Sequence, residues 1–356
     1  MKLVINKSTL ENVVSQMQPF LEKKDSSAIT SHLYLEIANS KMTIKATDYE
    51  IGLEVTIDTI SDFEDGKTTV NGNNLLGFIK RLKNEDINLE TSSNNLIIKQ
   101  GKSIFKLPSY DPNEYPTINK YENLKDLTIS TINFINSIKK ISPAIDNNNP
   151  KFELNGALLD IKSQKINFCA TDTRRLAMNS LENMSNEEVQ LIIPKKAIFE
   201  IQKLFLDNAK ISYDNTNLVI RNENTTFFTK LINGKYPDYE RIIPSNLKNN
   251  LYIPKNIFIE SIKLITSLNS NIKITFTTQG IIFESLDTDS VANTQVDIDL
   301  NIPNDFYIAV NAKYILDFLS MTTSDKIKIG FNESNLPFYL EDNKFITIVM
   351  PIVLEK

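Results

Sequence analysis

The chain has 356 residues, of which 41% are hydrophobic and 23% are charged, and its formal net charge is −5. This composition is typical of an ordinary soluble protein of two or three domains, and it argues against a nucleic-acid binder that works by net charge. One cysteine, Cys169, excludes an intrachain disulfide, and one histidine, His32, argues against a histidine-based metal site. No run of 18 apolar residues occurs, and the N-terminus turns polar too soon for a signal peptide, so we expect a cytoplasmic protein.

The first third of the chain alternates short strand patterns with two helical patterns. A helix is expected after Ser8 or Thr9, which can cap it, and Pro19 must end or kink it. A second helix is expected at about 73–83, and 108–121, with three prolines, is a candidate linker. Strands are expected at 3–6, 33–37, 42–46, 51–57, 87–89, 96–99 and 103–107.

The remaining two thirds show the same order of patterns. Helices are expected at 131–141, at 194–205 with Pro194 in its first turn, from Pro254 as its first residue, and at 312–321. The chain closes on an apolar run at 345–354. Strands are expected at 127–129, 152–161, 165–170, 209–213, 218–221, 227–231 and 251–253.

A long internal repeat explains this recurrence. Ala46-Thr47-Asp48 returns 124 positions later as Ala170-Thr171-Asp172, and Ile5 and Leu10 have apolar counterparts at successive steps of 124. A period of this size is that of a small domain rather than of a solenoid unit. The sequence therefore predicts an α+β protein of three tandem copies, each with two helices and about eight antiparallel strands. Their expected bounds are 1–120, 121–247 and 248–356.

Positive charge is concentrated on the expected helices and their immediate ends. We count thirteen bases against five acids there, a surplus of +8 on a chain whose net charge is −5. Such a bias favours a polyanion as the partner of the helices, although any single lysine can simply solvate a helix face. The bases are Lys23, Lys24, Lys80, Arg81, Lys83, Lys139, Lys140, Lys195, Lys196, Lys203, Lys255, Lys263 and Lys313.

Familiar catalytic motifs are missing. Gly72 and Gly77 have the spacing of a phosphate-binding loop, but Phe78 stands where lysine is required. Asp48 and Asp172 could form an acid pair, yet each is expected instead to order a turn at the end of a strand. Two alternatives stay open at this point: a metal-dependent hydrolase of a phosphorylated substrate built from scattered carboxylates, and a monomeric nucleic-acid-binding module.

Three motifs in order, embedded in the tandem repeats, resemble the bacterial DNA polymerase III beta subunit, the sliding clamp. They are the segment 170–177, the segment 234–239 (Gly-Lys-Tyr-Pro-Asp-Tyr) and Val349-Met350-Pro351. The resemblance covers the full length. It implies the DNA clamp fold, assembled as a head-to-tail dimeric ring whose helices line a hole around duplex DNA. It further implies a non-catalytic processivity factor without cofactor or metal, which tethers the replicative polymerase, the clamp loader and other DNA-processing proteins.

The resemblance also implies three sets of site residues. By motif, Phe105 and Leu268 are the candidates for the dimer interface. Expected DNA-facing cations are Lys23, Lys24, Lys80, Arg81, Lys83, Lys139, Lys140, Lys151, Lys195, Lys196 and Lys203. The expected wall of a pocket for short partner peptides is Leu154, Thr171, Thr173, Arg174, Arg175, Leu176, Pro237, Arg241, Ile242, Ile348, Val349, Met350, Pro351 and Ile352.

Two departures from the family pattern affect this pocket. The family commonly has Gly-His where this chain has Thr173-Arg174, which predicts a tighter and more charged floor. Family chains often end Met-Pro-Met-Arg-Leu, whereas here Ile352 is followed by two apolar residues and then Glu355-Lys356. We therefore expect an altered peptide preference.

Overall fold

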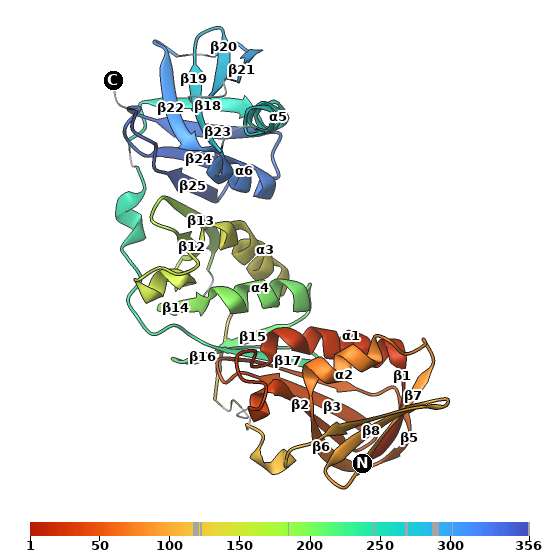
Figure 1. The fold of residues 1–356 in the computed structure, drawn as a ribbon. Helices are drawn as coiled ribbons and strands as arrows, with labels where there is room; N and C mark the ends of the chain where they lie inside the picture. Colours follow the sequence, from red (N-terminus) through yellow and green to blue (C-terminus); the bar gives the residue numbers. More distant parts are fainter. Residues whose placement is uncertain are drawn as a thin grey trace. The chain divides into compact units, whose positions relative to one another are not determined.

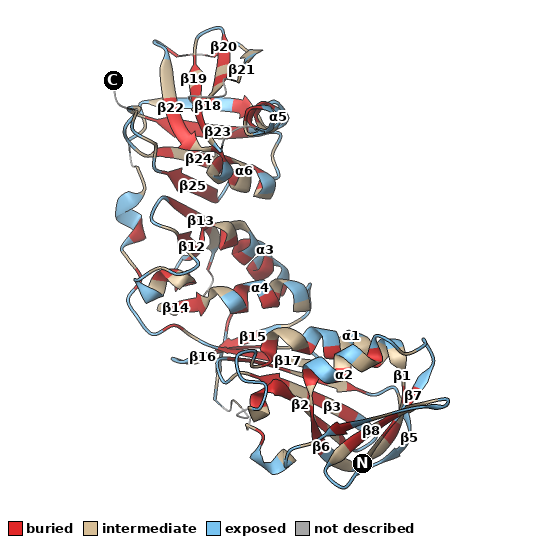
Figure 2. Ribbon diagram, viewed as in Figure 1, coloured by how far each residue is buried: buried red, intermediate tan, exposed pale blue. Residues whose placement is uncertain are grey.

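The computed structural model describes residues 1–116, 121, 123–183, 185–244, 246–267, 270–286, 292–300 and 302–354. The chain divides into two compact units, each built from two stretches: Met1–Ile132 with Glu200–Leu231, and Asn133–Phe199 with Ile232–Lys356. The strands of the middle repeat are therefore shared between the units. Figure 1 traces the elements of each unit, and Figure 2 marks the buried residues along them.

The first unit holds two antiparallel sheets. One is ordered β5 (Ile60–Glu64), β1 (Lys2–Asn6), β7 (Asp86–Ser92), β8 (Asn95–Gln100) and β9 (Ser103–Pro108). The other is ordered β10 (Lys125–Asp126), β15 (Lys210–Tyr213), β16 (Asn217–Arg221), β17 (Thr225–Lys230), β4 (Ile51–Ile57), β3 (Lys41–Thr47), β2 (His32–Ala38) and β6 (Gly66–Asn71). Because β17 pairs with β4, strands of the first and middle repeats form one continuous sheet.

Helices α1 (Lys7–Met17) and α2 (Gly72–Ile79) of this unit contact each other. Helix α1 is capped by Asn6 and not, as expected, by Ser8 or Thr9, which lie inside the helix; the Asn6 side chain accepts the N–H of Ser8 at 3.0 Å. Its buried residues Leu10, Val14 and Met17 follow helical spacing, and burying each such side chain contributes about 1.5–3 kcal/mol. Helix α2 is shorter than expected, because from Lys80 onward the chain leaves it through i→i+3 hydrogen bonds, such as Leu82 N–H to the Ile79 carbonyl.

The second unit also holds two antiparallel sheets. One is ordered β14 (Val189–Pro194), β11 (Gly156–Ile161), β12 (Lys165–Thr171), β13 (Arg175–Glu182), β25 (Phe345–Val349), β24 (Phe338–Asp342), β23 (Lys326–Phe331) and β18 (Asn249–Pro254). The other is ordered β21 (Asn293–Asp297), β20 (Gly280–Ser285), β19 (Asn271–Phe276) and β22 (Phe306–Asn311). Pairing of β13 with β25 joins the middle repeat to the third.

Four further helices complete the described chain: α3 (Thr131–Ile141), α4 (Lys195–Leu204), α5 (Lys255–Ile265) and α6 (Ala312–Met321). The expected bounds of α3 and α6 are confirmed. The repeat is visible in the caps, because Asn71 and Asn311 each accept a backbone N–H at the start of α2 and α6. Six short 3₁₀ turns join these elements: η1 (Gln18–Phe20), η2 (Ile29–Ser31), η3 (Pro112–Glu114), η4 (Ser142–Ala144), η5 (Phe152–Asn155) and η6 (Tyr239–Ile242).

Several further local expectations were wrong. The strand expected at 152–161 starts only at Gly156, because the preceding residues form η5. The strand expected at 127–129 lies earlier, at Lys125–Asp126, where it pairs with β15. Pro194 and Pro254 each end a strand, β14 and β18, so α4 and α5 begin one residue later than expected, at Lys195 and Lys255.

Candidate functional site

The turn between β12 and β13 is ordered by Asp172, as the sequence predicted. Its Oδ1 accepts the backbone N–H groups of Arg174 and Arg175, both at 3.0 Å. The Thr171 hydroxyl donates to the carbonyl of Arg175 at 2.6 Å and accepts the N–H of Thr173 at 3.1 Å. Thr173 takes φ 72°, the left-handed region that a side chain rarely adopts, so these bonds hold a strained corner.

The turn between β3 and β4 repeats this geometry in the first unit. Asp48 Oδ1 accepts the N–H groups of Glu50 at 3.1 Å and Ile51 at 3.0 Å, and Tyr49 takes φ 72°. Thr47 makes the same two bonds as Thr171. Each aspartate therefore serves its own turn, which is the structural role expected for it.

Strand alternation divides the expected pocket wall into two faces. Leu176 pairs with Ile348, and Arg175 pairs with Val349, so neighbouring residues point to opposite sides of the sheet. Leu154, Leu176 and Ile348 lie in one buried apolar cluster. Its other members are Leu158, Cys169, Ile192, Ile232, Tyr236 and Tyr239, with Met178, Ile243 and Tyr339 packed against it.

Arg175 and Val349 lie on the other face of the sheet. The Arg175 guanidinium donates to Asp317 of α6 at 2.7 Å and to Asp172 at 3.0 Å. Its Cζ lies over the Tyr314 ring, 4.6 Å from the ring centroid. Arg175 is only 6% exposed, so its charge is not presented to the apolar cluster. Arg175 and Leu176 are neighbours in β13, so their side chains point to opposite faces of the sheet and do not form one pocket wall as expected.

An exposed rim borders the apolar cluster. Met350 is 42% exposed, and its N–H donates to the carbonyl of Arg174 at 2.9 Å, so the chain end lies against the turn. Ile352 N–H bonds the Ala309 carbonyl at 2.7 Å, which fixes the chain end to β22. Thr173, Arg174, Arg241 and Ile242 are exposed, Pro237, Pro351 and Ile352 are half-buried, and Thr171 is buried.

Two tyrosines belong to the cluster although the sequence reasoning used them only as a motif. Tyr239 donates to Asp160 Oδ2 at 2.5 Å and accepts from Asn167 at 2.8 Å. Tyr236 is buried, and its hydroxyl finds no hydrogen-bond partner among the described residues. Burial raises the pKa of both phenols and of the Cys169 thiol, so all three are neutral at pH 7. Cys169 is thus a core residue, as expected.

The expected DNA-facing cations fall into two groups. Lys195 bonds the Ile145 carbonyl at 2.7 Å, Lys140 bonds Asn179 at 3.3 Å, and Lys203 pairs with Glu200 at 2.8 Å. The exposed cations without an ion pair to a described carboxylate are Lys23, Lys24, Lys80, Arg81, Lys83, Lys139 and Lys151. Lys196 is exposed as well.

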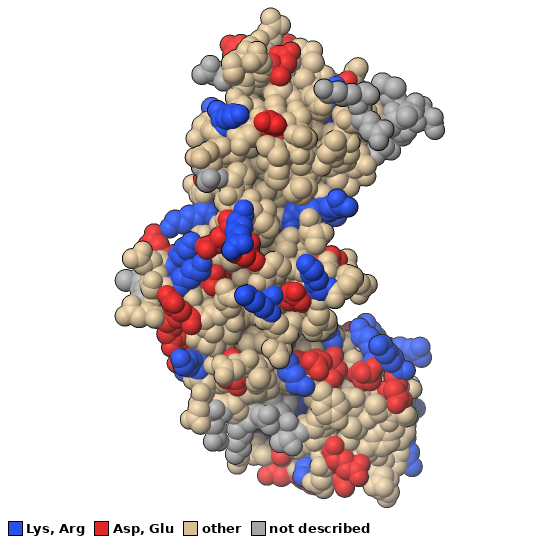
Figure 3. Space-filling view, turned by 90° about the vertical axis from the view of Figure 1, so that its left-hand side faces the viewer, with Lys and Arg blue, Asp and Glu red and all other residues tan. Residues whose placement is uncertain are grey.

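Within the observed bounds, the α-helices carry nine bases and four acids, a surplus of +5. The expected +8 was larger because it included residues such as Lys80 and Arg81, which follow the shortened α2. On the face drawn in Figure 3, basic and acidic side chains are intermixed.

The two dimer candidates have different outcomes. Phe105 is half-buried, with its ring 4.6 Å from that of Phe78, and Leu268 lies outside the described residues. Two exposed apolar residues were missed: Ile104, 67% exposed on edge strand β9, and Leu264, 61% exposed on α5. Periodicity assigns apolar residues to a core, so exposure of this kind is not visible in the sequence.

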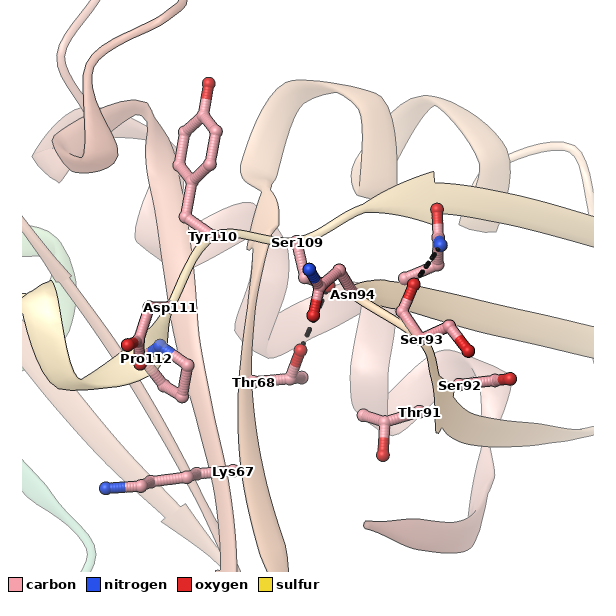
Figure 4. A pocket seen from close by; sticks show the side chains of 11 residues that line it. Lys67, Thr68, Thr91, Ser92, Ser93, Asn94, Ser109, Tyr110, Asp111 and Pro112 are labelled. Atoms are coloured by element: carbon pink, nitrogen blue, oxygen red, sulfur yellow. Dashed lines mark hydrogen bonds between the residues drawn. The ribbon is translucent and has the colours of Figure 1, made fainter.

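A separate polar hollow of about 470 Å³ lies in the first unit (Figure 4). Its wall includes Lys67, Tyr110 and the β7–β8 turn, and the hydroxyls of Thr68 and Ser109 bond each other across it at 3.0 Å. None of the residues expected to form a site lines it. Among the described residues no cluster of three metal-ligating side chains occurs, and no helix is long and apolar enough to cross a membrane.

Three segments of the chain match known domain families. Residues 1–119 match "DNA polymerase III beta subunit, N-terminal domain", residues 128–238 the central domain, and residues 240–353 the C-terminal domain of the same subunit. The segments follow one another along almost the whole sequence.

Curated relatives and solved structures agree with these matches. The beta sliding clamp of Helicobacter pylori is 39% identical over 99% of this chain and 100% of its own, and that of Staphylococcus aureus is 26% identical over 91% and 92%. The structure of the Helicobacter pylori beta clamp bound to a DNA ligase peptide superposes with a TM-score of 0.93 at 38% identity, covering 99% of this chain and 100% of that chain. The DNA polymerase III subunit beta of Pseudomonas aeruginosa, at 23% identity and a TM-score of 0.91, shares the fold over 99% and 100% of the two chains.

Proposed function

We propose that this chain, which belongs to the DNA polymerase III beta subunit family and is a DNA sliding clamp, binds its partners on the surface around Met350. We call this surface the partner pocket. Its floor is the apolar cluster with Leu154, Leu176 and Ile348. Its rim is Thr171, Thr173, Arg174, Pro237, Arg241, Ile242, Met350, Pro351 and Ile352.

The observation that carries this proposal is the exposure of Met350 two residues after Ile348, which belongs to the buried apolar cluster. An exposed, flexible thioether that follows a residue of such a cluster so closely in the chain suits the apolar anchors of a short linear peptide. Arg174 is exposed and makes no ion pair with the described residues, so it can meet a polar or acidic residue of the peptide. Arg241 already pairs with Asp238 at 2.7 Å and, being exposed, should add little.

The occupants we propose are peptides of the replicative polymerase, of the clamp loader and of other DNA-processing proteins. The Helicobacter pylori clamp binds a DNA ligase peptide, which supplies a practical probe. We further propose that the protein is an accessory subunit without chemistry of its own. Added divalent metal should then produce no turnover of DNA or of phosphorylated substrates.

Truncating Met350 tests the pocket. Met350→Ala should weaken binding of the ligase peptide by about 1–3 kcal/mol without unfolding the protein, because it removes an apolar anchor. Val353→Ala, which trims another exposed apolar side chain three residues on, is the matched control. Fluorescence polarisation measures both affinities. Equal affinity of the folded Met350→Ala variant and the control would remove the pocket assignment.

We propose that the clamp works as a head-to-tail dimer and that β9 forms one side of the interface. Strand β9 is a sheet edge, and it presents the exposed Ile104 beside Phe105. The third repeat would contribute α5, where Leu264 is exposed, with Leu268 retained as a neighbouring candidate. An unpaired edge strand with an exposed apolar side chain is a template for pairing with a second chain.

Replacing Ile104 with aspartate tests this interface. Ile104→Asp should yield monomers in sedimentation, because a charge would be buried without a partner. Leu336→Asp places a charge on another exposed apolar position, in the β23–β24 loop, which belongs to neither element, and should leave the dimer intact. Dimers that persist with Ile104→Asp would mean that a different edge is used.

We propose three clamp domains, 1–120, 121–247 and 248–356, in a cytoplasmic protein. Both domain bounds fall between strands, the first between β9 and β10 and the second between β17 and β18. The single cysteine, buried and reduced in the core, suits a reducing compartment. The exposed cations named above are the proposed DNA-facing residues, with Lys140, Lys195 and Lys203 contributing to the local potential while bonded within the protein.

A further inference from the structure

The side chain of Arg175 joins three segments of the second unit. Its Nε bonds Asp172 of the turn at 3.0 Å, its Nη1 bonds Asp317 of α6 at 2.7 Å, and its Nη2 donates to the Pro143 carbonyl in η4. The guanidinium also lies over the Tyr314 ring, 4.6 Å from its centroid. A buried guanidinium held this completely has one allowed position.

The turn itself does not need this arginine. In the first unit the equivalent position is Ile51, yet the turn around Asp48 makes the same backbone bonds at the same distances within 0.4 Å. Tyr49 and Thr173 share a φ of 72°. The side chain of Arg175 must therefore serve something other than local turn formation.

Arg174, the residue before Arg175, is bonded to the chain end that forms the rim of the partner pocket. The Arg174 carbonyl accepts the N–H of Met350 at 2.9 Å, and the Arg174 N–H is fixed by Asp172 at 3.0 Å. Asp172 thus binds both the backbone that carries Met350 and the guanidinium that reaches α6. The path from α6 to Met350 runs through Asp317, Arg175, Asp172 and Arg174, and each step is a hydrogen bond of 3.0 Å or less.

We propose that Arg175 is a positioning residue for the partner pocket, acting with Asp317 although neither side chain faces the apolar cluster. The inference rests on the proposed function of that pocket. Locking the turn to α6 holds the Arg174 carbonyl, and with it Met350, in the conformation that a peptide meets. Loss of the lock lets Met350 sample other positions, so binding must first order it, and affinity falls.

A double-mutant cycle tests the lock. Arg175→Met and Asp317→Asn should each lower the affinity for the ligase peptide five- to twentyfold. Because both changes break the same link, the double variant should bind no more weakly than the weaker-binding single variant. Lys313→Ala removes the other cation bonded to Asp317, at 3.0 Å and 67% exposed, and should change affinity less than twofold. Ile51→Met, the same position in the first turn, should have no effect.

A second readout reports on Met350 itself. With ¹³C-methyl labelling of the seven methionines, the Met350 signal should shift or broaden in free Arg175→Met and Asp317→Asn, and stay unchanged in Lys313→Ala. If Arg175→Met does not fold, Asp317→Asn, which keeps the side-chain shape, decides the question alone. Wild-type affinity and an unchanged Met350 signal in folded Asp317→Asn would overturn the inference. If Met350→Ala also leaves the affinity for the ligase peptide unchanged, the proposed function of the pocket is refuted. If Met350→Ala weakens binding, only the role of Arg175 and Asp317 is refuted.

Discussion

The two aspartate-ordered turns have one backbone geometry and different surroundings. Each lies between two strands of a repeat, and each following strand pairs with a strand of the next repeat, β4 with β17 and β13 with β25. Gly52 pairs with Phe228 across the first junction. At the equivalent position of the second junction, Leu176 pairs with Ile348. The two junctions therefore share one backbone arrangement and differ in the side chains that it carries.

This exchange decides which junction can present a pocket. A Cβ at Gly52 would lie 2.1 Å from a ring carbon of Phe228, so the ring occupies the space above the glycine. That ring also packs on Tyr121, with centroids 5.5 Å apart. In the second junction Leu176 and Ile348 instead belong to a buried apolar cluster, and the exposed Met350 follows Ile348 by two residues. One chain thus carries the same turn twice and, on our account, a partner pocket once.

The largest expected difference between the two units is in acid, because the single histidine lies in the first unit. In the first unit the linker tyrosine Tyr115 donates to the carbonyl of His32 at 3.2 Å, and the His32 ring stacks on Tyr110. Burial lowers the pKa of His32 from 6.5 to about 4. The unfolded chain therefore binds a proton between pH 6.5 and 4 that the folded chain refuses, so stability is full above pH 6.5 and falls as the pH drops to 4.

At about 1.4 kcal/mol per pKa unit, this group should lower the free energy of unfolding by about 3 kcal/mol over that range. His32→Phe keeps an aromatic ring against Tyr110 without the titration. Denaturant unfolding at pH 7, 5.5 and 4 should show a shallower loss in this variant than in the parent chain. Parallel losses in both proteins would show that His32 does not titrate as stated.

Removing either turn aspartate should give a smaller and more revealing effect. Asp48→Ala and Asp172→Ala each delete a carboxylate that accepts two backbone N–H groups, a loss of about 2 kcal/mol of stability. Only Asp172→Ala should also weaken the ligase peptide, because only that turn carries Met350. Thermal unfolding and fluorescence polarisation of the two variants make the comparison. Equal effects of both on peptide affinity would mean that the partner pocket is not specific to the second junction.

Local patterns predicted much of this fold. Helices α3 and α6, β4 and the ordering role of Asp172 follow from capping, periodicity and turn chemistry that are complete within a few residues. Tandem matches to one family confirm the repeat that the recurring Ala-Thr-Asp triplet indicated.

Long-range contacts account for what the sequence did not predict. The partner of Arg175 is Asp317, 142 positions away, and the division between Arg175 and Leu176 needs the register of β13 against β25. Exposure of Leu264 on an otherwise amphipathic helix depends on a surface that no local pattern describes. These are the residues on which the proposed lock and interface depend.

We expect this clamp to hold DNA by enclosing it. The helical surplus of +5 per chain comes from three helices, +2 from α3, +2 from α4 and +1 from α5, so few charges can meet phosphates at once. Affinity for short linear duplex should be weak and lost readily as salt rises, since each neutralised phosphate contributes about −0.9 to the log–log salt slope. The direct measurement is gel filtration of protein loaded by a clamp loader on closed circular DNA, before and after one nuclease cut. Enclosure predicts retention for many minutes on the circle and release once the circle is cut, whereas retention on the linear product with free ends would show that the protein grips DNA by contacts.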